Sequence, residues 1–324
     1  MSYKRIIIVL SGLLIFIFYS CNNQQDKYNR EYLKGFIDQY LEALIAHNTL
    51  SLQLADNVRY TENGQTLEPG DGMWGPANAV RDYKLYFIDT VSSQTGIFCV
   101  VEENGHPQIV ALRLKIENEK IGEIEEIVAR STQGGWNMPD SLKEQPIFSE
   151  PLKPEERCSR EEMIAIADSY FEGLEFNIDT LTPFAPNCTR IENGNITANN
   201  PNGESPIHMM PADAQFATGF STFITRIRER RYPIVDEKRG LVYAIVFFDH
   251  AGTITDVTMT NGASFRVPPP YDTPYCFLIG ELFKIKDRKI TRIEAVLLEV
   301  PYGMTSGWST WDKLISSEPI YYNE

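Results

Sequence analysis

Apolar residues recur every three or four positions between residues 30 and 48, which predicts an amphipathic helix. The apolar positions of this helix are Leu33, Phe36, Ile37, Tyr40, Leu41 and Leu44. A strand at 58–62 follows and ends at Asn63 and Gly64, a pair typical of hairpin turns. Later apolar runs predict strands near 96–103, 108–117 and 121–130.

The second half of the chain follows the same order. It predicts a helix at 160–176, a strand at 188–192 and a turn at Asn193 and Gly194. A helix near 214–229 comes next, and the last predicted strands lie near 240–249, 276–286 and 290–300. Helices followed by a curved antiparallel sheet indicate an α+β fold in each half.

The two halves also share residue identities. When residues 30–64 are shifted by 130 positions, 11 of 35 are identical, whereas average composition gives roughly two. Near the end of each half the matching offset is 169, so the second copy has gained about 39 residues. A period this long indicates duplicated domains and not a solenoid.

These patterns predict domain boundaries along the whole chain. Domain 1 covers residues 29–138, a Pro-, Glu- and Lys-rich linker covers 139–157, and domain 2 covers 158–312. Domain 2 carries inserts near 199–213 and 253–275. The remaining segments are a signal peptide at 1–20, a tether at 21–28 and a C-terminal tail at 313–324.

Three segments have a pattern found in a known superfamily: the helix end Tyr40–Asn48, the segment Leu54–Tyr60 and the closing strands from Leu114 to Glu125. Together they resemble the nuclear-transport-factor-2-like superfamily of cone-shaped domains. The superfamily includes ketosteroid isomerase, scytalone dehydratase and the SnoaL polyketide cyclases. The chain also resembles a tandem family of unassigned function, through its Glu-Asn-Gly turn and the segments Gly70–Trp74 and Arg230–Asp236. The resemblance specifies a fold better than an activity.

The resemblance implies a cone with a pocket between sheet and helix. It also implies pairing of domains through the sheet face, which a tandem chain could satisfy internally as a pseudo-dimer. A chain that forms dimers through this same face would contradict that hypothesis.

The N-terminal segment is typical of an exported protein. Lys4 and Arg5 precede the apolar run Ile6–Phe18, which is too short to span a bilayer comfortably. Ser20 and Cys21 resemble a bacterial lipoprotein box, which implies cleavage before Cys21 and acylation of that residue, and multiple acyl chains anchor stably. We expect a lipid-anchored cell-envelope protein in the outer membrane. The alternatives are a plain signal peptide and an uncleaved anchor.

The net charge and the cysteine content further restrict the partners and the covalent cross-links that we expect for this chain. The 324 residues carry a net charge of −14, which argues against a nucleic-acid partner. An exported chain can form disulfides, and Cys158 with Cys188 is the pair to test. Cys99 lies in an apolar run that favours a buried free thiol, and Cys276 is left unassigned.

Asp249, His250 and His208 are the candidate acid–base residues. Asp249 and His250 end an apolar run, and histidine titrates near neutrality. Because neighbouring strand residues point to opposite faces, at most one of the two faces the pocket. His208 lies in the first insert, where it could cover the domain 2 pocket. The alternatives are a polar loop cap for the pair and an exposed loop for His208.

Arg226, Arg228 and Arg230 form a basic cluster in an acidic protein, together with Arg231. On the predicted helix Arg226 and Arg230 share a face, where they could bind a carboxylate, sulfate or phosphate. The alternative is salt bridging to the nearby acids Glu229, Asp236 and Glu237.

Two aromatic residues and two acids complete the candidate ligand-binding set. Tyr60 and Trp74 could line a pocket for a ring or a sugar, although aromatic core is the alternative. Glu62 and Glu192 occupy matching strand ends, where burial could raise the pKa of one of them. The alternative is an acid that accepts backbone hydrogen bonds beside the Asn-Gly turn.

The sequence lacks a phosphate-binding glycine loop, a nucleophile elbow and a zinc motif, so we expect no cofactor and no metal. Two hypotheses of different classes remain. The first is a non-catalytic module that binds a small organic or sugar-like ligand or an envelope protein. The second is a cofactor-independent isomerase, dehydratase or cyclase that uses acid–base residues in domain 2.

Overall fold

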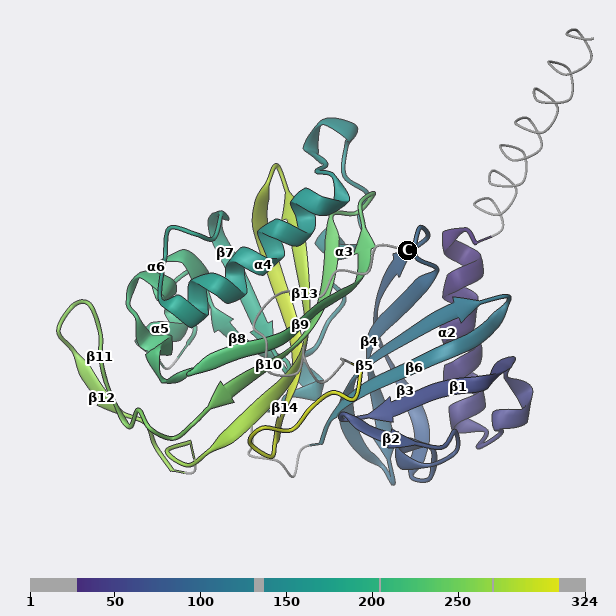
Figure 1. The fold of residues 1–324 in the computed structure, drawn as a ribbon. Coiled ribbons are helices and arrows are strands. Elements are labelled where there is room, and N and C mark those ends of the chain that lie inside the picture. Colours follow the sequence, from purple (N-terminus) through teal and green to yellow (C-terminus); the bar gives the residue numbers. More distant parts are fainter. Residues whose placement is uncertain (1–27, 131–136, 204, 270, 309–324) are drawn as a thin grey trace, which may run out of the picture.

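The computed structural model describes residues 28–130, 137–203, 205–269 and 271–308. The predicted signal peptide 1–20, Cys21 and the tail 313–324 lie outside these residues. No helix of the described ranges combines the length and the apolar character that a membrane span requires. The described chain forms two sheet-based units, each with a long helix on one side of its sheet (Figure 1).

Domain 1 opens with helix α2 (Arg30–Ile45), which begins where the side chain of Asn29 accepts the backbone N–H of Tyr32 at 3.1 Å. The helix ends three residues earlier than the sequence pattern predicts. Two short helices follow, η1 (Thr49–Ser51) and η2 (Gly72–Trp74). The strands are β1 (Leu54–Glu62), β2 (Gln65–Leu67), β3 (Ala77–Asp89), β4 (Gln94–Glu103), β5 (His106–Glu117) and β6 (Lys120–Ala129).

The linker contains the short helices η3 (Pro139–Ser141), α3 (Pro146–Ser149) and η4 (Pro154–Glu156). Domain 2 then opens with α4 (Arg160–Phe176), the range that the sequence predicts, behind a capping box of Ser159 and Glu162. Its remaining helices are α5 (Pro206–Met209), α6 (Ala212–Ala217) and η5 (Phe220–Phe223). Its strands are β7 (Phe184–Glu192), β8 (Asn195–Ala198), β9 (Arg226–Asp236), β10 (Leu241–His250), β11 (Asp256–Thr258), β12 (Ser264–Arg266), β13 (Tyr275–Lys286) and β14 (Lys289–Val300).

The two large sheets have the same topology. Their strand orders are β2-β1-β6-β5-β4-β3 and β8-β7-β14-β13-β10-β9. In each sheet the first long strand runs parallel to the last one, β1 to β6 and β7 to β14, while the other neighbours are antiparallel. The predicted α+β class is confirmed, and each sheet is mixed because of this one parallel pair.

A comparison of matching strand ends in the two domains shows where domain 2 has additional residues. Strands β1 and β7 end at residues 62 and 192, an offset of 130, and β3 and β9 end at 89 and 236, an offset of 147. Strands β5 and β13 end at 117 and 286, an offset of 169. Domain 2 has therefore gained residues in two steps. The first step added α5, α6 and η5 before β9, and the second added the β11–β12 hairpin before β13 (Figure 1).

The repeated Asn-Gly turn has the same role in both domains. Asn63 and Gly64 both have positive φ angles, 52° and 78°, as a tight hairpin requires. The Asn63 side chain donates to the carbonyl of Val128 at 3.3 Å and accepts the N–H of the same residue at 2.7 Å. Asn193 makes both bonds to Leu297, at 2.7 and 2.9 Å. Each turn is thus fastened to the last strand of its sheet.

One face of each sheet packs against the other sheet. Residues of β3–β6 and of β9, β10, β13 and β14 share one apolar cluster, with Phe148 of the linker among them. Gly280 permits the close approach, because a Cβ there would lie 2.5 Å from the Tyr243 hydroxyl and 3.2 Å from Ile127 of the other domain. The opposite faces form separate cores beneath α2 and α4.

Two matching ion pairs flank this interface. Arg30 of α2 contacts Asp236 of domain 2 at 2.5 Å, and Arg160 of α4 contacts Asp89 of domain 1 at 2.5 Å. The arginines are separated by the offset of 130 and the aspartates by the offset of 147, so each pair is the counterpart of the other. Both aspartates are buried.

A buried charge cluster lies between the sheets. Glu125 of β6 accepts from Nε of Arg113 at 2.9 Å and from a guanidinium N–H of Arg231 at 3.1 Å. Arg231 belongs to β9, so this cluster joins the two domains. All three side chains are almost fully buried.

One prediction about residues 226–236 is wrong, and one strand was not predicted. Residues 226–236 form strand β9 and not the end of a helix, and only short helical turns occupy 212–223. Strand β3 was not predicted at all, because polar residues interrupt its apolar positions. The four cysteines at 99, 158, 188 and 276 are buried and free, so Cys158 and Cys188 are not joined.

Candidate functional site

Domain 2 contains a cavity of about 180 Å³ beside helix α4, on the face of the sheet that this helix covers. Tyr170 and Leu174 of α4 form one wall. Segments that domain 2 has gained cover it, because Phe220 and Phe223 lie on η5 and Phe265 lies on β12. The cavity therefore lies where domain 2 departs from domain 1. We call it the domain 2 pocket.

His250 sits in the aromatic part of this pocket. Its imidazole stacks on Tyr275 with ring centres 4.2 Å apart and planes 5° from parallel. Phe223 and Phe277 lie 5.5 and 5.3 Å from it. Burial lowers the pKa of His250 to about 4, so the ring is neutral at pH 7. Its Nδ1 has no hydrogen-bond partner among the described residues.

Arg190 forms the polar part of the pocket. Its guanidinium donates to Oγ1 of Thr197 at 3.1 Å, to the hydroxyl of Tyr170 at 3.2 Å and to Oε1 of Gln215 at 2.9 Å. Its Nε also lies 3.4 Å from Oε1 of Glu192. A buried guanidinium with these partners is a fixed positive charge beside the cavity.

Glu281 lies behind Tyr170 and is buried. Burial, and then the charge of Glu192, raise the pKa of Glu281 to about 8 despite a hydrogen bond with Tyr170. Glu281 is therefore mostly protonated at neutral pH. Tyr170 links it to the pocket wall, because this tyrosine contacts the pocket and Glu281 alike.

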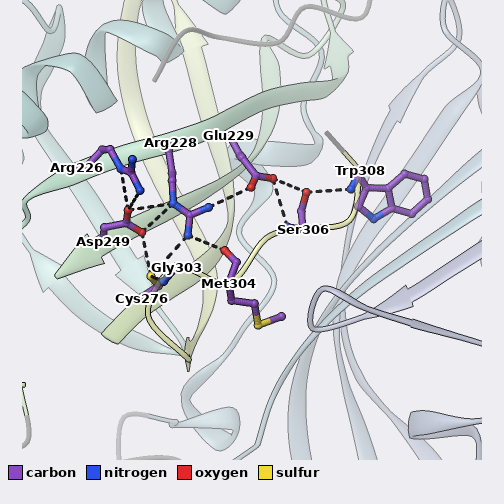
Figure 2. A network of polar contacts seen from close by, with 9 residues as sticks. All are labelled: Arg226, Arg228, Glu229, Asp249, Cys276, Gly303, Met304, Ser306 and Trp308. Atoms are coloured by element: carbon purple, nitrogen blue, oxygen red, sulfur yellow. Dashed lines mark hydrogen bonds and ion pairs between the residues drawn. The ribbon is translucent and has the colours of Figure 1, made fainter. Parts of the chain in front are cut away.

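Asp249 points to the opposite face of β10 from His250. Its carboxylate accepts from Arg226 at 2.6 and 2.8 Å and from Arg228 at 3.0 Å, and the Cys276 thiol donates to it at 2.9 Å (Figure 2). Burial favours a higher pKa, but these bonds outweigh it and hold the pKa of Asp249 below its usual value. The structure places Asp249 outside the domain 2 pocket, so it does not reach a ligand there.

The arginine cluster is neutralised by acids of the chain. The helical face expected for Arg226 and Arg230 does not exist, because both residues lie on β9. Arg228 pairs with Glu229 at 3.0 Å and donates to the carbonyl of Met304 at 2.6 Å, while Arg230 lies 3.0 Å from Asp168. The ion pairs among these contacts are salt bridges, the alternative that the sequence suggested for this cluster, but Glu229 is the one expected partner among them.

The same network holds the C-terminal segment 301–308 against both domains (Figure 2). Ser306 donates to Glu229 at 2.6 Å, and the indole of Trp308 donates to Thr61 of domain 1 at 2.9 Å. The Arg59 guanidinium lies 4.2 Å from the Trp308 ring centre, within cation–π range. This arrangement serves the contact between the domains.

Three further candidates lie in the domain 1 core. Tyr60 donates to Glu126 at 2.8 Å, and Trp74 donates to the hydroxyl of Tyr40 at 2.9 Å. Glu62 accepts the backbone N–H of Met73 at 2.6 Å and pairs with Arg130 at 2.8 Å. Burial and the charge of Glu62 raise the pKa of Glu126 to about 8.

Of the sequence candidates, the structure brings His208, His250 and Glu192 together around one pocket. Tyr170, Arg190 and Glu281 were missed. The offset of 130 aligns Arg190 with Tyr60 and Tyr170 with Tyr40, so the repeat itself could have drawn attention to both positions. Among the described residues no cluster of three or more His, Cys, Asp and Glu side chains is placed to hold a metal ion.

A larger open groove of about 950 Å³ runs between the domains beside the start of α2. Its charged walls include Arg30, Asp236 and Arg239, which pair with one another. Asp89 in the same groove is held by Arg160. The Arg30–Asp236 and Arg160–Asp89 pairs in this groove therefore join the two domains.

Comparison with known proteins finds one part of the chain similar to a family without an assigned function. A family model described as Domain of unknown function (DUF8021) matches residues 156–297. No curated protein matches the chain. A crystal structure of a de novo designed protein with a curved β-sheet is 16% identical, with a TM-score of 0.22, and the match covers 31% of this chain and 87% of that one.

A second similar structure is an NTF-2 like protein of unknown function from Burkholderia xenovorans LB400. It is 11% identical, with a TM-score of 0.24, and the match covers 36% of this chain and 95% of that one. At these TM-scores neither likeness indicates what the domain 2 pocket binds.

Proposed function

We propose that this chain is a binding module whose domain 2 pocket takes a small organic molecule with a single ring. The observation that carries the proposal is the cavity itself, about 180 Å³ in volume and covered in part by two added segments that domain 1 lacks. A cavity of about 150 Å³ lined by apolar side chains is known to bind benzene. One ring with a short substituent therefore matches the available volume.

The lining favours a flat ring over a flexible chain. Phe223, Tyr275 and Phe277 surround one part of the cavity, and aromatic rings pair by edge-to-face and offset contacts. Most residues that line the whole pocket are apolar or aromatic, which fits the usual composition of small-molecule sites. Arg190, Thr197 and His208 supply hydrogen-bonding groups elsewhere in the wall.

Domain 1 acts in this proposal as a scaffold. Its core contains Met73 and Trp74, both almost fully buried, at the counterpart of the insert region of domain 2. The sheet face that superfamily members use for dimers is covered by domain 2, which supports the pseudo-dimer hypothesis. A stable dimer through that face would contradict it.

A second function has one observation in its favour. Tyr170 lines the pocket and shares a hydrogen bond with Glu281, whose pKa is raised to about 8. Burial raises the pKa of Tyr170 well above its usual value, so this hydroxyl would act by donating a hydrogen bond and not a proton. Such a bond could stabilise an enolate in a lyase, isomerase or cyclase reaction. Under this alternative the bound molecule would be converted into a different product before its release. Tyr170→Phe would then retain binding but abolish turnover.

We also propose attachment to the bacterial outer membrane through Cys21. Its support is the N-terminal sequence alone. Palmitate labelling of cells that express the wild type and Cys21→Ser tests it, with label expected on the wild type only. Label on both proteins, or on neither, would overturn the anchor without affecting the pocket.

Calorimetry tests the binding function directly. The full-length chain in lipid nanodiscs is titrated with p-cresol and with toluene, and empty nanodiscs supply the blank. We expect saturable binding that Ile224→Trp abolishes, because half-buried Ile224 lines the pocket and the larger ring fills it. Leu50→Trp, at a residue 94% exposed in domain 1, is the matched control and should bind normally. Equal binding by both variants would refute the assignment.

A further inference from the structure

Two hollows of domain 2 meet at the same pair of side chains. The domain 2 pocket and an open cleft of about 570 Å³ are both lined by Thr197 and His208. Thr197 is buried on β8, and half-buried His208 lies on the short helix α5 of the first insert. A molecule that occupied both hollows would pass against these two residues.

The pocket is polar on the side that meets the cleft. Arg190 and Glu192 lie on β7, next to β8, and Nε of Arg190 donates to Thr197 at 3.1 Å. The aromatic group around His250 lies on β10 and β13, which β14 separates from β7 in the sheet. A ligand in the pocket would therefore have its ring among the aromatic side chains and its polar end toward His208.

The cleft combines amide groups with exposed apolar side chains. Asn195, Asn200 and Asn202 line it, together with Met138 at 52% exposure and Ile196 at 39% exposure. The Asn200 amide donates once, to the carbonyl of Ile196 at 3.1 Å, and accepts the N–H of Asn202 at 3.1 Å. An amide has two donors and two acceptor positions, so one of each stays available to a ligand.

We propose that the ligand has two parts, an apolar ring in the domain 2 pocket and a hydroxyl-rich group in the asparagine-lined cleft. Hydroxyls on a carbon ring present hydrogen-bonding edges and apolar C–H faces, which match amides beside Met138 and Ile196. A ring glycoside is the simplest molecule of this class. This inference rests on the proposed function of the pocket and specifies its ligand.

The test compares p-cresol with its β-glucoside, which shares the same ring, on the full-length chain in lipid nanodiscs. Two to three added hydrogen bonds predict that the glucoside binds at least about tenfold tighter. Asn202→Ala and Asn200→Ala should each reduce that preference several-fold and leave p-cresol affinity unchanged. Unchanged p-cresol affinity also shows that each variant is folded. Asn57→Ala, an exposed asparagine of domain 1, is the matched control and should keep the full preference.

The outcomes separate this inference from the proposed function. Equal or weaker binding of the glucoside, with p-cresol still bound, overturns the two-part ligand and leaves the pocket standing. Loss of affinity for both compounds in the Asn202→Ala variant also overturns it, because the substitution would then have disturbed the fold of the pocket and not a contact with the hydroxyl-rich group. If neither compound binds to the wild type, the proposed function fails and this inference fails with it.

Discussion

Replacing Glu125 with Gln preserves the shape of the side chain and removes its charge from between two buried guanidinium groups. Arg113 and Arg231 both donate to this carboxylate, and all three side chains are at most 5% exposed. Breaking a buried ion pair by removing one partner typically costs about 3–5 kcal/mol, because the remaining charge stays buried and uncompensated. We expect a loss of that size in the free energy of unfolding.

Urea unfolding measures this loss. With a dependence on urea of roughly 3 kcal/mol per molar, the unfolding midpoint should fall by about 1 to 1.7 M. Glu123→Gln is the matched control, because Glu123 contacts the same Arg113 at 2.8 Å but its side chain is 25% exposed. A partly exposed pair contributes about 1 kcal/mol or less. A Glu125→Gln midpoint within about 0.3 M of the wild type would refute the reasoning.

The pH dependence of the same pair supplies a second check. Burial favours a higher pKa for Glu125, but the charges of Arg231 and Arg113 outweigh it, so the pKa is lowered. A carboxyl with a lowered pKa stabilises the fold above its unfolded pKa and loses that contribution as the pH falls through the folded value. The difference between wild type and Glu125→Gln should therefore be largest at neutral pH and shrink in acid.

Three other changes give expected outcomes. Glu281→Gln should gain thermal stability relative to the wild type as the pH rises from 5 to 9. The reason is that the pKa of Glu281 is about 8 in the folded wild type, which therefore loses stability as the pH rises through that window. A difference in stability that stays constant with pH would contradict this. Asn63→Ala and Asn193→Ala should each cost about 1–3 kcal/mol in urea unfolding, since each leaves two strand groups unpaired, and a loss in one domain only would contradict the shared role. Asp249→Asn should destabilise the fold but leave p-cresol affinity within about twofold, whereas a large loss of affinity would place Asp249 in the pocket.

Local pattern was enough to predict much of the fold. Helix α4 has the predicted limits because its apolar spacing and capping box lie within one segment. Strand β9 was misread, because its arginines fall at spacings that a helix also produces. A bulge at Glu229, whose φ is 51°, breaks the simple alternation of this strand. Strand β3 was not predicted because its polar residues have their partners in the neighbouring strand and in the linker, which the local sequence pattern does not reveal.

The site was less predictable because it depends on contacts far apart in the sequence. Alternation along β10 limited the pocket to one of Asp249 and His250, but it did not say which one faces inward. The answer depends on Arg228 and Cys276, which lie 21 and 27 residues away from Asp249. Glu281 had no sequence signal, since a lone acid within an apolar strand does not reveal its partners.

Because each sheet covers an apolar face of the other, the face of domain 1 stays uncovered during part of translation. Domain 1 is complete at β6, but its covering strands begin at Arg226, about 100 residues later. Until those residues emerge, the first sheet has an apolar face in contact with water, and such surfaces promote aggregation. The last strand, β14, ends at Val300, so the growing chain must be kept from self-association almost until translation is finished.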